Sequence, residues 1–109
     1  MDGCKLLNDS HNPKMDVFLL TKPPKSDRAR ICMQLIARSE DVILYLAGDG
    51  AYNLLDDAFK ALPRERIFAC KEDLEARGIQ SEGIVAVPND FYEMLVENIM
   101  LDGNRIYTF

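Results

Sequence analysis

The segment Val42-Ile43-Leu44-Tyr45-Leu46 is the clearest strand signal in the chain. Its residues are β-branched, aromatic or leucine, which is typical of a strand buried on both faces. Gly48-Asp49-Gly50 ends this strand, and apolar residues then recur at helical spacing up to Pro63. That spacing predicts an amphipathic helix over residues 51–62. A buried strand followed by a turn and a helix is the repeating unit of an α/β fold.

The same alternation extends in both directions from this segment. Short apolar runs predict four further strands, at residues 17–20, 66–70, 84–87 and 106–109. Three further helices are expected between them. Ser26 caps the first, Gly78 ends a short helix over residues 71–77, and Asn89 or Asp90 caps the last one. Glu93 completes a capping-box pattern with Asp90, and Gly103 breaks this last helix.

Strands that alternate with helices require crossover connections, which are right-handed and place helices on the faces of the sheet. We therefore expect an α/β fold, a three-layer sandwich with a mostly parallel sheet of four or five strands, close to flavodoxin-like in layout. Ligands and chemistry in such sheets gather beyond the carboxyl ends of the strands. The segments to consider there are residues 21–26, 48–52, 70–73 and 88–90.

Length and charge bound the possible functions. A chain of 109 residues suits one domain, which we place at residues 15–109, with residues 1–14 as a loose N-terminal arm. No apolar run approaches the roughly 20 residues of a membrane span, and no basic-then-apolar leader opens the chain, so we expect a cytoplasmic protein. The net charge of −5 argues against direct nucleic-acid binding, which needs a concentrated positive face.

The three cysteines are the most informative reactive residues. With a single histidine, His11, and no closely spaced cysteine pair, we expect neither a metal site nor a disulfide framework. Cys70 stands where the third strand ends and a helix begins, where unpaired N–H groups and the helix dipole favour a thiolate. The alternative for Cys70 is a buried strand-end thiol. Cys32 lies on an apolar helix face and is interpreted as core, whereas Cys4 and His11 fall in the loose arm.

Two other groups of residues are candidate binding sites. Gly48-Asp49-Gly50 lacks the glycine and lysine residues of phosphate-binding loops, so we interpret it as a tight turn with Asp49 as a helix cap. No nucleotide, flavin or other cofactor is therefore expected. The basic residues after the first strand either dock an anionic partner or form a solvated face; they are Lys22, Lys25, Arg28 and Arg30.

The segment 66–79, Arg-Ile-Phe-Ala-Cys-Lys-Glu-Asp-Leu-Glu-Ala-Arg-Gly-Ile, resembles the DsrE/DsrF/DsrH and TusB/TusC/TusD sulfur-relay superfamily. Those chains share a strand, a short helix and an Ala-Arg-Gly or Arg-Arg-Gly ending. The Glu-Asp-Leu-x-Ala-Arg-Gly core, together with Asp49-Gly50 after the second strand, looks most like the DsrH/TusB branch. Length and strand-helix order extend the resemblance over residues 15–109 and imply a DsrE-like fold.

This resemblance implies a cytoplasmic protein that works in a hetero-oligomer with DsrE/DsrF- or TusC/TusD-like subunits, or that self-associates. Such proteins pass persulfide sulfur from donor to acceptor proteins, toward 2-thiouridine in tRNA or toward sulfur oxidation. In the DsrE/TusD branch the sulfur-accepting cysteine stands eight residues before the glycine of this motif, and Cys70 stands at that distance from Gly78. TusB-like chains usually have an apolar residue there, so the chain departs from its own branch at the position that matters.

Two hypotheses follow. In the first, the Cys70 thiolate accepts and passes on persulfide sulfur, as an accessible thiol of low pKa would. In the second, the chain is a non-catalytic assembly subunit and Cys70 is inert. Interface candidates for that role are the aromatic C-terminal residues and the apolar residues of the last helix, namely Tyr107, Phe109, Met94, Ile99 and Met100.

Overall fold

The structure, a computed structural model, describes residues 15–56, 59, 62–80 and 85–109, and every structural statement below concerns these residues. The elements run in the order β1 (Asp16–Leu20), α2 (Asp27–Ala37), β2 (Val42–Leu46), η1 (Gly48–Leu55), η3 (Arg64–Arg66), β3 (Ile67–Ala69), α3 (Lys71–Ala76), α4 (Phe91–Met100) and β4 (Arg105–Thr108). The two η elements are 3₁₀ helices. The predicted N-terminal arm, with Cys4 and His11, lies outside the described residues.

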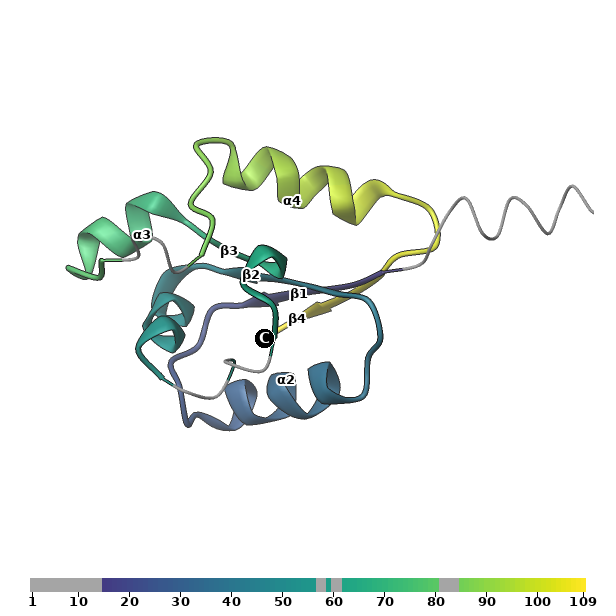
Figure 1. Ribbon diagram of the computed structural model, residues 1–109, viewed down its shortest axis with the longest axis horizontal. Coiled ribbons are helices and arrows are strands. Elements are labelled where there is room, and N and C mark those ends of the chain that lie inside the picture. Colours follow the sequence, from purple (N-terminus) through teal and green to yellow (C-terminus); the bar gives the residue numbers. More distant parts are fainter. Residues whose placement is uncertain (1–14, 57–58, 60–61, 81–84) are drawn as a thin grey trace, which may run out of the picture.

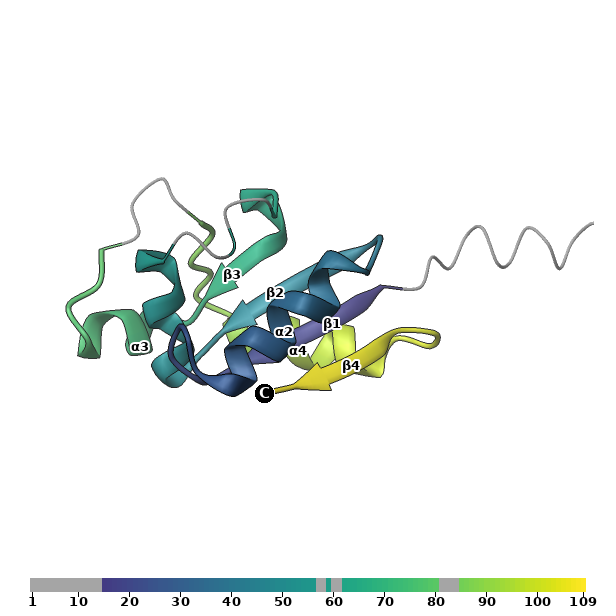
Figure 2. The ribbon, with the colours of Figure 1, turned by 90° about the horizontal axis from the view of Figure 1, so that it is seen from below.

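The four strands form one parallel sheet in the order β3-β2-β1-β4. The steps from β1 to β2 to β3 all run in one direction, so right-handed crossovers place their connections on one face. The return from α4 to β4 runs the opposite way, which puts α4 on the other face (Figure 1). The expected three-layer α/β sandwich is confirmed, and Figure 2 shows the sheet with α2 in front of it.

Alternation along the buried strands divides the core into two halves. Phe18, Leu44 and Ala69 belong to the half beneath α2, whereas Val17 and Tyr45 belong to the half beneath α4. Successive side chains of a strand point to opposite faces of the sheet, so each apolar run supplies both halves. This explains why the strand sequences are almost continuously apolar.

Two predicted helix ends are confirmed in detail. The Ser26 hydroxyl accepts a hydrogen bond from the Ala29 N–H at 3.2 Å and caps α2. At the end of α3, Gly78 has φ +66° and its N–H donates to the Glu75 carbonyl at 3.2 Å. The Ile79 N–H donates back to the Leu74 carbonyl at 3.0 Å, so the left-handed glycine turns the chain out of the helix.

The amphipathic α-helix predicted over residues 51–62 is wrong over its first turns. Gly48–Leu55 forms a 3₁₀ helix, and Asp56 after it is extended. A 3₁₀ helix turns by 120° per residue, so Ala51 and Leu54 share a face while Leu55 points away from it. Leu55 is accordingly 67% exposed. Part of the remaining predicted helix lies outside the described residues.

Two further expectations were only partly met. The strand predicted at residues 84–87 is reduced, in the described residues, to a single parallel bridge between Ala86 and Phe68. Asp90 is the N-cap of α4, but its ψ of 41° is not extended and its side chain makes no capping hydrogen bond. The predicted capping box with Glu93 is therefore wrong.

Candidate functional site

Cys70 connects β3 to α3 at the carboxyl edge of the sheet. It is the N-cap residue of α3, and its carbonyl accepts from the Leu74 N–H at 3.0 Å. Its own N–H donates to the Leu46 carbonyl of β2 at 3.1 Å, which fixes the cysteine to the neighbouring strand. The side chain belongs to the core half beneath α4, together with Tyr45 and Phe91.

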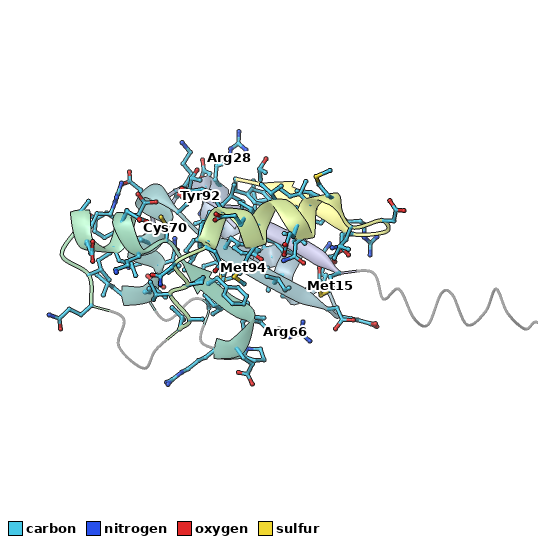
Figure 3. The ribbon with its side chains drawn as sticks, turned by 90° about the horizontal axis from the view of Figure 1, so that it is seen from above. Met15, Arg28, Arg66, Cys70, Tyr92 and Met94 are labelled. Atoms are coloured by element: carbon cyan, nitrogen blue, oxygen red, sulfur yellow. The ribbon has the colours of Figure 1, made fainter. Side chains whose placement is uncertain are left out.

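The Cys70 side chain is buried but hydrogen-bonds to exposed residues. The residue is only 2% exposed. Its thiol donates to Glu72 Oε1 at 3.5 Å, and the Tyr92 side chain hydrogen-bonds to the same sulfur. Tyr92 comes from the first turn of α4 and is 54% exposed, and Figure 3 shows both residues at the end of the molecule where α3 and the start of α4 lie.

The expectation of an accessible thiol with a lowered pKa is wrong for this conformation. Burial raises the pKa of Cys70, and the side chain of Asp73 raises it further through a hydrogen bond and through its charge. The Asp73 backbone N–H and Tyr92 oppose this increase without reversing it. α3 has only six residues, and a helix of fewer than two turns provides a weak dipole to offset desolvation.

Asp73 also connects the site to the glycine turn after β2. Its Oδ2 accepts from the Gly48 N–H at 2.6 Å. Arg77, one turn later, donates from Nε and Nη2 to Asp49 Oδ1, both at 3.1 Å. Asp49 therefore binds an arginine and does not cap a helix, because the N-cap of η1 is Ala47. These contacts fix α3 against η1 and so set the position of Cys70.

Cys32 is confirmed as a core residue. It is 0% exposed and packs in the core half beneath α2, on the face opposite Cys70. Burial raises its pKa to about 12, so the thiol stays protonated at neutral pH. In the described part of the chain, no three His, Cys, Asp or Glu side chains are placed to hold a metal ion.

The basic residues after β1 are not brought to Cys70. Arg28 and Arg30 belong to the first turn of α2, on the face of the sheet opposite α4 (Figure 1). Arg30 forms an ion pair with Asp27, while Lys22 and Lys25 are exposed in the preceding loop. The exposure of these basic residues fits their interpretation as a solvated face.

Comparison with known proteins identifies the family. The sequence model of the family described as "DsrH like protein" matches residues 22–101, from the loop after β1 to the residue after α4. The chain is a DsrH-like protein. The matched region includes Cys70 and Tyr92, and it supports the DsrH/TusB branch of the sulfur-relay superfamily. No curated protein and no solved structure matches the chain.

The family places this DsrH-like protein in sulfur relay, which multi-subunit systems carry out. Among the residues that the structure describes, no helix is long and apolar enough to cross a bilayer. Sequence reasoning found Cys70 but missed Tyr92, which stands two residues beyond the edge segment 88–90. The available signal was the right-handed return crossover, which brings the start of α4 back over the carboxyl edge.

Proposed function

We propose that this DsrH-like protein carries sulfane sulfur as a persulfide on Cys70. The observation that supports this proposal is the placement of Cys70 at the carboxyl edge of a parallel sheet, with hydrogen bonds to the exposed side chains of Tyr92 and Glu72. Cys32 lies deep in the opposite half of the core, with a pKa near 12, and has no such route to solvent.

The proposed step is a thiol–persulfide exchange. The Cys70 thiolate attacks the outer sulfur of a donor persulfide, R–S–SH. A new sulfur–sulfur bond forms to Cys70, the donor bond breaks, and the donor leaves as the thiolate R–S⁻. The outer sulfur keeps its proton, and no external oxidant or reductant is required. Transfer to an acceptor thiolate repeats the exchange in the forward direction.

We expect Tyr92 to move before Cys70 reacts, because its side chain hydrogen-bonds to the buried sulfur. In the covered state, burial and Asp73 keep the thiol protonated. Displacement of the Tyr92 ring would hydrate the sulfur and lower its pKa, since desolvation is the largest cause of the raised value. The partner that brings or receives sulfur is therefore expected to displace Tyr92 as it docks.

Mass mapping of bound sulfur tests the proposal. The full chain is incubated with polysulfide, blocked with iodoacetamide and digested, and each cysteine peptide is searched for one added sulfur atom. We expect added sulfur on Cys70 and none on Cys32. Tyr92→Ala should load faster than the parent chain, and Cys70→Ser should not load within residues 15–109. Loading confined to another cysteine, with Cys70 unmodified even in Tyr92→Ala, would overturn the proposal.

The burial of Cys70 also fits a second candidate, the non-catalytic assembly subunit. In that case Cys70 is a packing residue of the core half beneath α4 and needs no exposure. The two candidates differ in one measurement. When the relay is reconstituted with DsrE- and DsrF-like subunits, Cys70→Ser should abolish sulfur flux if Cys70 is a carrier and leave flux unchanged if the chain only supports assembly.

A further inference from the structure

Two clefts meet at Asn53, on the face of the sheet that α2 covers (Figure 2). One cleft, of about 270 Å³, extends from Asn53 to Ile67 at the start of β3. The other, of about 360 Å³, lies between Asn53 and α2. Asp56 and Phe59 also line both clefts, so the two are neighbours. Together they fall within the size range of sites for small organic molecules.

The walls of both clefts are largely apolar. Phe59, which is 7% exposed, belongs to both of them, and Ala29 and Met33 of α2 line the second. A flat apolar ring placed in the clefts would be removed from water against these side chains. The apolar residues of the first cleft come from η1, from β3 and from the segments beside β3, namely Leu54, Phe59, Leu62, Ile67 and Val85.

The Asn53 side chain places a buried hydrogen-bond acceptor where the clefts meet. The residue is 2% exposed, and its Nδ2 donates to the carbonyls of Lys22 and Gly50, both at 2.9 Å. These two bonds fix the amide and leave Oδ1 on its other side. Oδ1 is buried and accepts from no donor in the described part of the chain. Buried acceptors in native proteins have partners, so a ligand N–H that reached this oxygen would form a strong contact.

Exposed cationic residues of the second cleft favour an anionic group on the ligand. Lys25 and Arg30 both line this cleft. Lys25 forms no ion pair within the described ranges, and the pair of Arg30 with Asp27 is exposed and therefore weak. Asp56 lines the same cleft, so a singly charged carboxylate suits the site better than a doubly charged phosphate.

The clefts open near the edge of the sheet where α/β proteins bind ligands. Lys25 follows β1 and Asn53 follows β2, so both lie beyond the carboxyl ends of parallel strands. Cys70 follows β3 at the same edge, but its side chain belongs to the core half beneath α4. A molecule in the clefts is therefore separated from the Cys70 sulfur by the sheet.

We propose that these clefts bind a small cyclic carboxylate that carries an N–H donor on its ring. The ring lies against Phe59 and the other apolar walls, and its N–H donates to Asn53 Oδ1. The carboxylate pairs with Lys25 and Arg30. Because Lys22 and Gly50 already hold the Asn53 amide, little side-chain freedom is lost on binding at this point.

Indole-3-acetate has all three features and serves as the probe. Titration of the full chain, followed by two-dimensional amide NMR, gives the Kd and the residues whose signals shift. We expect saturable binding with shifts centred on Asn53 and α2. 1-Methylindole-3-acetate lacks the ring N–H and should bind about tenfold more weakly. Indole-3-ethanol lacks the carboxylate, so it should bind more weakly and lose the salt dependence that the acid shows.

Matched variants separate the site from the fold. Lys25→Asn removes the cation, and asparagine tolerates the φ of +69° at this position, so the Kd should rise about threefold or more while the fold is kept. Lys22→Asn removes the same charge from the same loop outside both clefts and should leave the Kd unchanged. Ala29→Leu fills the second cleft and should abolish binding. Ala37→Leu, at an exposed position of α2, should not.

Three results would overturn the proposal, once circular dichroism shows that the variants fold. They are no saturable binding of indole-3-acetate, equal affinity for its 1-methyl derivative, and binding that Lys25→Asn and Ala29→Leu both leave unchanged. Equal affinity for the methylated probe would mean that water, not the ligand, serves Asn53 Oδ1.

This proposal does not depend on sulfur chemistry. Cys70→Ser should bind the probe as tightly as the parent chain, because the sheet lies between Cys70 and the clefts. Probe binding without persulfide loading would therefore reject the proposed function alone, and persulfide loading without probe binding would reject the ligand site alone.

Discussion

At the level of single residues, Asp73 controls how readily Cys70 ionises. Its carboxylate raises the pKa of Cys70 through a hydrogen bond and through charge, in addition to the larger effect of burial. We predict that Asp73→Asn lowers the pKa of Cys70, because the negative charge is removed. The measurement is the rate of Cys70 alkylation by iodoacetamide as a function of pH, in a Cys4→Ser background. The midpoint should move to lower pH.

The asparagine in this variant keeps an oxygen that can accept from the Gly48 N–H, so the connection between η1 and α3 is preserved. Thermal unfolding checks that it is. Glu75→Gln, an exposed carboxylate on the same helix, is the matched control for loss of one charge. A midpoint that stays the same in Asp73→Asn, or moves to higher pH, would contradict the role assigned to Asp73.

The buried thiol of Cys32 makes the stability of the fold depend on pH in the alkaline range. Its pKa is about 12 in the folded chain, against an ordinary value of 9.0, so the folded state holds the proton more tightly than the unfolded state. The free energy of unfolding should therefore fall as pH rises from about 9 toward about 12, by at most about 1.4 kcal/mol per pH unit for this thiol. Urea unfolding at a series of pH values from 7 upward measures how the free energy of unfolding changes with pH.

Cys32→Ala is the comparison that isolates this thiol. The variant is expected to be less stable at neutral pH because it removes a buried side chain. Its stability should nevertheless decline less steeply above the ordinary thiol pKa than that of the parent chain. Tyr45, whose pKa burial also raises, titrates in both proteins and cancels in the difference. Parallel curves for the two proteins would show that Cys32 does not titrate as described.

At the level of elements, η1 depends on a close approach to β1. A Cβ at Gly50 would lie 1.9 Å from the Leu20 carbonyl oxygen, so no side chain fits without moving one backbone from the other. We predict that Gly50→Ala lowers the free energy of unfolding by about 3 kcal/mol or more, as overpacked positions do. Urea denaturation is the measurement.

Gly78→Ala is the matched control for this prediction. Gly78 has φ +66°, but a Cβ there meets nothing within 4 Å. The substitution should lower the free energy of unfolding by only about 1–2 kcal/mol, the cost of a left-handed conformation for alanine. Equal effects of the two substitutions would show that the approach of Gly50 to Leu20 is not the limiting contact.

The same contact explains what sequence could and could not predict about the elements. Runs such as residues 42–46 determine strands locally, because both faces of a central strand are buried and the whole run is apolar. Residues 51–55 of η1 are predicted as α-helix because positions i and i+3 are apolar in both helix types. The choice between them is made by the Gly50 contact with Leu20 and by Asn53, whose side chain donates to the carbonyls of Lys22 and Gly50.

The candidate site shows the same limit. The position of Cys70 after β3 followed from the local pattern alone. Its burial did not, because it packs with Phe91 and Leu95 of α4, an element that begins twenty-one residues later in the chain. The carboxylate of Asp73 was visible in the sequence, but its effect on Cys70 depends on distances that only the folded chain sets. Local sequence therefore predicts where the thiol lies and leaves its ionisation undetermined.

At the level of the whole molecule, α4 connects the two ends of the described chain. Asn98 in α4 donates to the Tyr45 hydroxyl at 2.6 Å, and the Asn98 carbonyl accepts from the Asn104 side chain at 2.9 Å. Asn104 Oδ1 in turn accepts from the Met15 N–H at 3.1 Å, just before β1. This chain of hydrogen bonds crosses from the centre of the sheet to its edge. It fixes the turn between α4 and β4 and thereby the register of the last strand.

The ion pair between Asp16 of β1 and Arg105 of β4 gives a prediction about how the last strand is held in the sheet. Asp16 is buried, and its Oδ1 accepts from Arg105 Nε at 3.0 Å across 89 residues of sequence. Arg105→Ala leaves a buried carboxylate without this partner and should lower the free energy of unfolding by about 1–3 kcal/mol. In Arg105→Ala the further change Asp16→Asn should recover part of that loss, because an amide is less costly to bury than a charge. A double-mutant cycle by urea denaturation, at protein concentrations below any self-association, should give a coupling of about 0.5 kcal/mol or more. A coupling near zero would mean that backbone pairing and the stacking of Phe18 on Tyr107, with ring centroids 4.8 Å apart, hold β4 without help from the charge pair.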